Sequence, residues 1–208
     1  EFRRRHTPAV LLDNYVKVNP NTAYIGVDNS EGMNLAVSYL KEQGHRKIGY
    51  LSGALGSYIN QQRYSAFFHA LRKYGLPDDP SLGGNAYLFS DCLQKHLPRL
   101  LKQGVTAIVC SHDLLAHTVM LHLQELHIQV PEDISIIGFD DLPICAYTMP
   151  PMTTIRQHRT QIGKSAYYAL SSLMQGTPIS TLLLHAQLIV RQSTGPAPEV
   201  PYGLREKK

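Results

Sequence analysis

Short apolar runs alternate along this chain with longer segments in which apolar residues recur every three or four positions. The short runs predict β-strands, and the longer segments predict amphipathic helices. We expect strands at residues 9–13, 23–28, 47–53, 86–89, 105–110, 133–139 and 182–194. We expect helices at residues 29–44, 57–75, 90–104, 112–127 and 161–176.

Local signals set the boundaries of these helices. Asn29 or Ser30 is expected to cap the helix at 29–44, and Gly44 is expected to end it. Pro98 lies inside the helix at 90–104 and is expected to kink or split it, because proline cannot donate a backbone hydrogen bond. The segment after residue 194 is rich in proline and charge, which predicts a loose tail.

Strands and helices that alternate in this way are typical of a doubly wound α/β fold with parallel sheets. Ligands in such folds bind beyond the carboxyl ends of the strands. Several residues able to contact a ligand stand at those ends and are expected to gather around one crevice: Asp13, Asp28, Phe89 with Ser90, the segment 111–113, and Asp140 with Asp141.

The composition is that of an ordinary globular protein, with 208 residues, 43% hydrophobic and 17% charged. This length allows one large domain or two lobes. The net charge of +4 is small, and we find no basic stripe of the kind that binds nucleic acid. No apolar run is long enough to predict a membrane span, and no signal peptide is visible.

The cysteines and histidines do not predict a metal site. Three widely spaced cysteines form neither a disulfide framework nor a CxxC pair, and this usage fits a reducing cytoplasm: Cys92, Cys110 and Cys145. Four histidines recur every five residues, at 112, 117, 122 and 127. On a helix each such step turns the side chain by roughly 140°, so the four do not share a face. Zinc pairs on helices use spacings of three or four.

Two adjacent carboxylates, Asp140 and Asp141, follow the strand expected at 133–139. They are candidates for a catalytic pair, a metal site or ligand acceptors. Adjacent residues point in different directions and seldom act together as acid and base. We therefore expect Asp140 to bind a ligand and Asp141 to cap the local loop. Arg63, in the helix at 57–75, is either an exposed arginine or a residue that reaches the crevice.

Sequence motifs for nucleotide binding and catalysis are absent. "GALGSY" is the nearest glycine-rich loop, but it has neither the GxGxxG spacing nor the lysine of a P-loop. No GxSxG elbow is present. We therefore expect no enzymatic activity and no cofactor.

Several longer segments resemble the lactose/galactose-repressor (LacI/GalR) family of transcriptional regulators. The resemblance runs from about residue 8 to residue 195 and is most specific in "VPEDISIIGFDD" followed by "PPMTTIRQ". It is also carried by "AVLLDNYV", "IGVDNSEGMNLAVSYLKEQGHRKIGYLSG", "QQRYSAFFHALRKYGL", "TAIVCSHD" and "LIVRQSTG".

The resemblance implies a core shaped like a periplasmic sugar-binding protein, with two parallel-sheet α/β lobes and an effector between them. It implies a homodimer, and operator DNA bound through a helix-turn-helix that these residues do not include. Residues 1–28 and 159–186 would be the remnant of an incomplete N-terminal lobe. Residues 29–158 and 187–195 would form the C-terminal lobe, and 196–208 a tail.

The family pattern also assigns an effector site. Asp13 and Asp140 match acidic positions that hold sugar hydroxyls, and Arg63 matches an effector-contacting arginine. Phe89 matches the stacking aromatic, although a core position is the alternative. Three further residues complete the set: Tyr58 in the loop before Arg63, His112 where the family usually has asparagine, and Gln157 on a strand that crosses between lobes.

Chemistry supports a sugar or a related small molecule as the effector. Carboxylates accept hydrogen bonds from hydroxyls, guanidinium groups donate to them, and an aromatic ring packs on the C–H face of a sugar. The alternative is a solute-binding protein of a sugar transport system, which has the same fold. The cysteines, the regulator-type motifs and the lack of an export signal favour the regulator.

Overall fold

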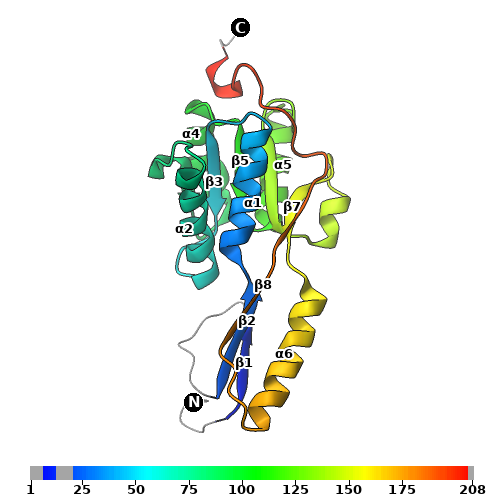
Figure 1. Cartoon of the computed structure of the whole chain (residues 1–208). Coiled ribbons are helices and arrows are strands. Elements are labelled where there is room, and N and C mark those ends of the chain that lie inside the picture. The colour runs from blue at the N-terminus through cyan, green and yellow to red at the C-terminus, as the bar shows by residue number, and fades with distance from the viewer. Residues whose placement is uncertain (1–6, 13–20, 206–208) are drawn as a thin grey trace. The chain divides into compact units, whose positions relative to one another are not determined.

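The structure is a computed structural model that describes residues 7–12 and 21–205. The chain divides into two compact units. Unit 1 consists of Glu1–Asp28 and Gln157–Ala186, and unit 2 consists of Asn29–Arg156 and Gln187–Lys208. The chain therefore passes between the units at three junctions, after residues 28, 156 and 186. Figure 1 shows the elements of each unit.

Unit 1 is a small parallel sheet packed against one helix. Its strands run in the order β1 (Ala9–Leu12), β2 (Thr22–Val27), β8 (Thr181–Leu184), and both pairings are parallel. The helix α6 (Arg159–Met174) covers one face of this sheet. Alternate residues of β2 point to that face, and they form a buried cluster with the helix: Ala23, Ile25, Ile162, Ala169 and Leu173.

Unit 2 is a six-stranded sheet with the order β4-β3-β5-β6-β7-β9. The parallel strands are β4 (Gly83–Asn85), β3 (Ile48–Ser52), β5 (Ala107–Cys110), β6 (Ser135–Asp140) and β7 (Thr153–Arg156). The edge strand β9 (Gln187–Ile189) is antiparallel. All residues of β3 and β5 are buried, as expected for parallel strands covered on both faces. The doubly wound α/β class predicted from the sequence is confirmed.

Three longer helices surround this sheet: α1 (Asn29–Glu42), α2 (Tyr58–Lys73) and α5 (Asp113–Glu125). Helix α1 packs along α2 and approaches the sheet closely at Gly32, where a Cβ atom would lie 2.8 Å from the ring of Phe139. Short helical segments complete unit 2: η1 (Pro80–Leu82), η3 (Pro143–Ala146) and η4 (Tyr202–Leu204).

The helix expected at 90–104 is interrupted, as Pro98 predicts. It is built from α3 (Phe89–Asp91), a π-helical segment η2 (Cys92–His96) and α4 (Leu97–Lys102). Pro98 lies in the first turn of α4, where its missing N–H is tolerated.

The strand expected at 86–89 is wrong. The edge strand β4 forms instead from Gly83–Asn85, paired with β3. These glycines allow side chains to pack directly on the strand, since a Cβ at Gly84 would lie 2.5 Å from the Cβ of His96. Tyr87 and Leu88 follow in an irregular, exposed stretch, so their apolar character does not reflect burial in a sheet.

The single strand expected at 182–194 is also wrong. This stretch supplies β8 to the sheet of unit 1 and β9 to the sheet of unit 2, with a break at residues 185–186. A continuous apolar run does not reveal the break, because both halves have strand character.

Residues 195–205 are not a loose tail. The Ala197 amide donates to the Gln43 carbonyl, and Arg205 forms an ion pair with Asp133. Gly203 lies against the backbone of Leu101 so closely that no side chain would fit. These contacts fasten the segment to unit 2 despite its proline-rich composition. Among the described residues, no helix is both long and apolar enough to cross a membrane.

Candidate functional site

The carboxyl ends of the strands of unit 2 surround a buried arginine. Arg63, from α2, is only 4% exposed. Its Nη1 donates to the Ser111 carbonyl at 2.5 Å and to Asp140 Oδ1 at 3.3 Å. Its Nε donates to Asn29 Oδ1 at 2.9 Å, and its guanidinium lies 3.7 Å from the centroid of the Phe139 ring. A buried cation requires several acceptors, and these partners supply them.

Asp140 and Asp141 occupy a sharp turn at the end of β6. Their φ angles of 118° and 52° are unusual for residues other than glycine. The turn sends the two carboxylates to different partners. Asp140 pairs with Arg63, whereas Asp141 pairs with Arg156 at 2.6 Å and Arg191 at 2.8 Å.

Asp141 is held as a carboxylate by this pairing. Burial alone would raise its pKa, but the hydrogen bonds and charges of Arg191 and Arg156 outweigh burial, so the pKa of Asp141 lies below its ordinary value. Asp141 therefore has a local structural role, while Asp140 remains partly accessible at the strand end.

Asp113, the first residue of α5, is fully buried and holds the same turn by hydrogen bonds. Its carboxylate accepts from Thr154 Oγ1 at 2.6 Å and from the Leu142 amide at 2.7 Å. Burial raises the pKa of Asp113 to about 6, although these hydrogen bonds partly offset burial. The sequence predicts the segment 111–113 at the crevice without a role for Asp113. The signal that points to it is an acidic residue in the first turn of a helix that follows a buried strand.

We expect the contribution of Asp113 to the free energy of unfolding to fall as pH rises through its titration. The folded-state pKa of about 6 lies above the ordinary value of 3.8, so the folded state binds the proton more tightly. This contribution is complete below about pH 4 and is lost as pH approaches and passes 6, with a size on the order of 1–3 kcal/mol. Chemical denaturation from pH 4 to 8 measures it. In Asp113→Asn this fall should be absent from the dependence of the unfolding free energy on pH between pH 4 and 8. The same pH dependence in parent and variant would contradict the assignment.

His112 lies beside Asp140 and Arg63 with one nitrogen occupied. Its Nδ1 and Ser111 Oγ are 2.8 Å apart, and the Gly53 amide donates to the same hydroxyl oxygen at 3.4 Å. The hydroxyl proton is thus available to Nδ1, which leaves the Nε2–H as a donor. Burial lowers the pKa of His112, Asp140 opposes that shift, and Arg63 adds to it. The imidazole is therefore neutral at pH 7.

Phe89 and Tyr58 also join this group, and Tyr58 is the first residue of α2 rather than part of the expected loop. Phe89, the first residue of α3 rather than the end of a strand, packs its ring against His112 with centroids 5.3 Å apart. The Tyr58 hydroxyl accepts from Gln62 Nε2 at 2.7 Å. Gln62 in turn accepts from Asn29 Nδ2 at 3.1 Å, so Tyr58 connects to Arg63 through two amide side chains.

The structure therefore links five of the predicted site residues within unit 2, with His112 joined through Ser111, whose carbonyl accepts from Arg63: Tyr58, Arg63, Phe89, His112 and Asp140. Asp13 lies outside the described residues. Gln157 is buried and belongs to unit 1. It follows the last residue of β7, so its expected position within a strand is wrong.

The linked group offers the accessible carboxylate of Asp140, N–H donors from a guanidinium and an imidazole, and the aromatic ring of Phe89. This set can hold a small molecule that carries hydroxyls and an apolar face. Within residues 7–12 and 21–205, no group of three or more histidine, cysteine, aspartate or glutamate side chains could hold a metal ion.

Comparison with known proteins identifies the class and then the family. The periplasmic binding protein-like domain matches residues 37–194, and the chain belongs to this family. Within it, the predicted LacI/GalR resemblance is confirmed by the relatives. The chain is 32% identical over 199 residues to the HTH-type transcriptional repressor CytR of Escherichia coli K12. The match covers 94% of this chain and 58% of CytR, so the chain spans little more than half of that protein.

Solved structures agree. The dimeric Lac repressor with a C-terminal deletion superposes with a TM-score of 0.79 at 27% identity, covering 92% of this chain and 70% of that one. The complex of transcriptional regulator CelR with cellobiose gives a TM-score of 0.79 at 26% identity, covering 88% of this chain and 58% of that one.

Proposed function

We propose that this chain is the ligand-binding and dimerisation core of a LacI-type transcriptional regulator that senses a sugar or a related small molecule. The observation that carries the proposal is the buried Arg63, held beside the accessible Asp140 at the carboxyl ends of parallel strands. The CelR complex contains cellobiose, and CytR is named a repressor. Catalysis forms no part of the proposal.

The effector contacts follow from the chemistry of the site. Asp140 accepts from ligand hydroxyls, Arg63 and the neutral His112 donate, and Phe89 packs on an apolar face. His112 replaces the amide usual in the family and presents a single donor. We propose that this difference restricts the effector to a molecule with an acceptor at that point. Tyr58, Asp13 and Gln157 are proposed as further contacts.

The proposal extends to the rest of the regulator. Residues 1–28 and 159–186 are proposed as part of the N-terminal lobe, and residues 29–158 and 187–195 as the C-terminal lobe. These ranges differ from units 1 and 2 at residues 157–158, which lie in unit 1, and at residues 196–208, which lie in unit 2. Operator DNA is recognised by a helix-turn-helix outside residues 1–208. Such a regulator works in the cytoplasm, where the chromosome lies.

A thermal-shift screen of the full-length protein tests this function. Binding stabilises the native state by mass action, by about 2.7 kcal/mol when the ligand is at a hundred times its Kd. We expect at least one compound among sugars, sugar phosphates and nucleosides to raise the melting temperature. The same compound should change the affinity of the full-length protein for operator DNA. A compound that binds without any effect on DNA affinity would favour the transport-protein alternative.

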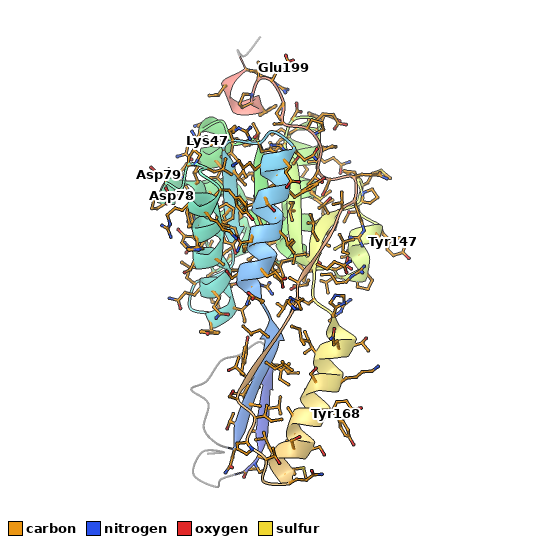
Figure 2. All side chains as sticks on the ribbon, viewed as in Figure 1. Lys47, Asp78, Asp79, Tyr147, Tyr168 and Glu199 are labelled. Carbon is orange, nitrogen blue, oxygen red and sulfur yellow. The ribbon has the colours of Figure 1, made fainter. Side chains whose placement is uncertain are left out.

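The homodimer surface is proposed from exposed apolar residues of unit 2. Leu114 and Leu121 lie seven residues apart on one face of α5, and both are about half exposed. Tyr147 and Met149, just after η3, are 85% and 90% exposed, and Figure 2 shows Tyr147 projecting outward. A cavity of about 730 Å³ lies between α5 and the segment after η3. A partner side chain can fill that cavity, and the Lac repressor structure is of a dimer.

We expect the double variant Leu121→Asp, Tyr147→Asp to be monomeric, because two charges would be buried at the core of the interface without partners. Sedimentation equilibrium of the full-length protein measures the association. Tyr168→Asp, at an exposed tyrosine of α6 (Figure 2), is the control and should leave the dimer intact. A double variant that remains dimeric would place the interface elsewhere.

A further inference from the structure

The three junctions between the units share one feature on the unit 2 side. The unit 2 residues that border the three crossings are Asn29, Arg156 and Gln187. Each has a side chain tied, directly or through one further residue, to Asp140 or Asp141. Arg156 also stands beside Asp140 in the sheet, and Gln187 pairs with Arg156 on its other side.

The first junction is tied to Asp140 through Arg63. Asn29 is 6% exposed, and its Oδ1 accepts from Arg63 Nε at 2.9 Å. Nη1 of the same guanidinium donates to Asp140 at 3.3 Å. Because the guanidinium is planar and rigid, a change in the direction of one bond moves the other. A lysine in its place has no such fixed geometry.

The other two junctions are tied to Asp141 through Arg156. Nε of Arg156 donates to Asp141 Oδ2 at 2.6 Å, and its Nη1 donates to Gln187 Oε1 at 3.4 Å. Arg191, two residues after β9, donates to the second oxygen of Asp141 at 2.8 Å. The carboxylate of Asp141 is thus connected both to Arg156, where the chain leaves unit 2, and to the segment at Gln187, where it returns.

We propose that each of the two adjacent carboxylates positions different junctions. Asp140, through Arg63, positions the junction at Asn29, and Asp141, through Arg156, positions the junctions at 156–157 and 186–187. A ligand held by Asp140 and Arg63 thereby acts on the first junction. This last step rests on the proposed function, whereas the division of the ties does not. Asn29 and Arg156 are positioning residues in this scheme.

Hydrogen exchange of the full-length protein, read by mass spectrometry, tests the division without any ligand. Arg63→Lys and Asn29→Ala should speed exchange in the first turn of α1 about tenfold and leave residues 154–158 unchanged. Asp141→Asn should speed exchange at 154–158 and 187–191 about tenfold and leave the first turn of α1 unchanged. Arg72→Ala, which removes an exposed ion pair with Asp78 from α2, is the control and should change neither.

Exchange in β5 reports global unfolding, so each rate is expressed relative to β5. If Arg63→Lys lowers overall stability, Asn29→Ala still tests the first junction, because it keeps both charges. The proposal is overturned if the two classes of variant loosen the same junctions, or if neither loosens any.

Hydrogen exchange in the presence of a ligand distinguishes a failure of this proposal from a failure of the proposed function. D-ribose, D-cellobiose and adenosine serve as probes. A probe that binds should slow exchange in the first turn of α1 in the parent protein and have no such effect in Asn29→Ala. Slowing of equal size in both proteins overturns the coupling to the first junction. If none of the three binds, the choice of effector class is wrong, while the division of the ties is decided by the variants alone.

Discussion

Gly138→Ala is expected to destabilise unit 2 by about 2–4 kcal/mol, because a methyl group has no space at this position. Gly138 lies in β6 directly opposite the carboxylate of Asp113, and an added Cβ would overlap Asp113 Oδ1. That oxygen accepts from Thr154, and its neighbour accepts from the Leu142 amide. To make room, Asp113 would have to give up these bonds, and the turn that carries Asp140 would lose its support.

Urea denaturation of the parent and the variant measures this effect through the free energy of unfolding. Gly56→Ala is the matched control, since a Cβ at Gly56 meets nothing within 4 Å, and it should change the free energy by less than about 0.5 kcal/mol. A Gly138→Ala variant as stable as the control would show that Asp113 can move without cost.

The sequence predicts the sheet of unit 2 well where strands are long and apolar. The runs that became β3, β5 and β6 are uninterrupted and β-branched, which is the signature of strands buried on both faces. The edge strand β4 carries no such signal, because Gly83 and Gly84 have no side chains and so allow neighbouring side chains to approach closely. Edge strands of this composition cannot be found from hydrophobic patterns.

The candidate site was predictable in its main pair. The residues alone place Asp140 at the crevice and leave Arg63 open between an exposed position and the crevice. The family resemblance assigns both to one site, and the two side chains meet. The roles of Asn29 and Asp113 were not predictable. Each depends on a donor that arrives from a distant part of the chain, Arg63 for Asn29 and Leu142 for Asp113. The spacing of residues in the sequence does not show which distant residues will form hydrogen bonds with one another.

Asp140→Asn is expected to weaken effector binding roughly ten- to a hundredfold while leaving the fold intact. A charge-assisted hydrogen bond contributes about 1.5–3 kcal/mol, and the amide keeps the shape of the carboxylate but loses its charge. The buried strand before Asp140 is unchanged by the substitution. Asp141→Asn has the opposite profile, because Arg156 and Arg191 lose their shared partner and the protein loses stability rather than affinity.

Isothermal titration calorimetry on the full-length protein, with a compound that raises its melting temperature, tests the central claim most directly. The parent, Asp140→Asn and Asp141→Asn are titrated side by side, with melting curves for each. We expect Asp140→Asn to bind at least about tenfold more weakly while remaining folded, and Asp141→Asn to bind with nearly the parent's affinity at a lower melting temperature. Undiminished affinity in Asp140→Asn would contradict the account and place the effector site away from Arg63 and Asp140.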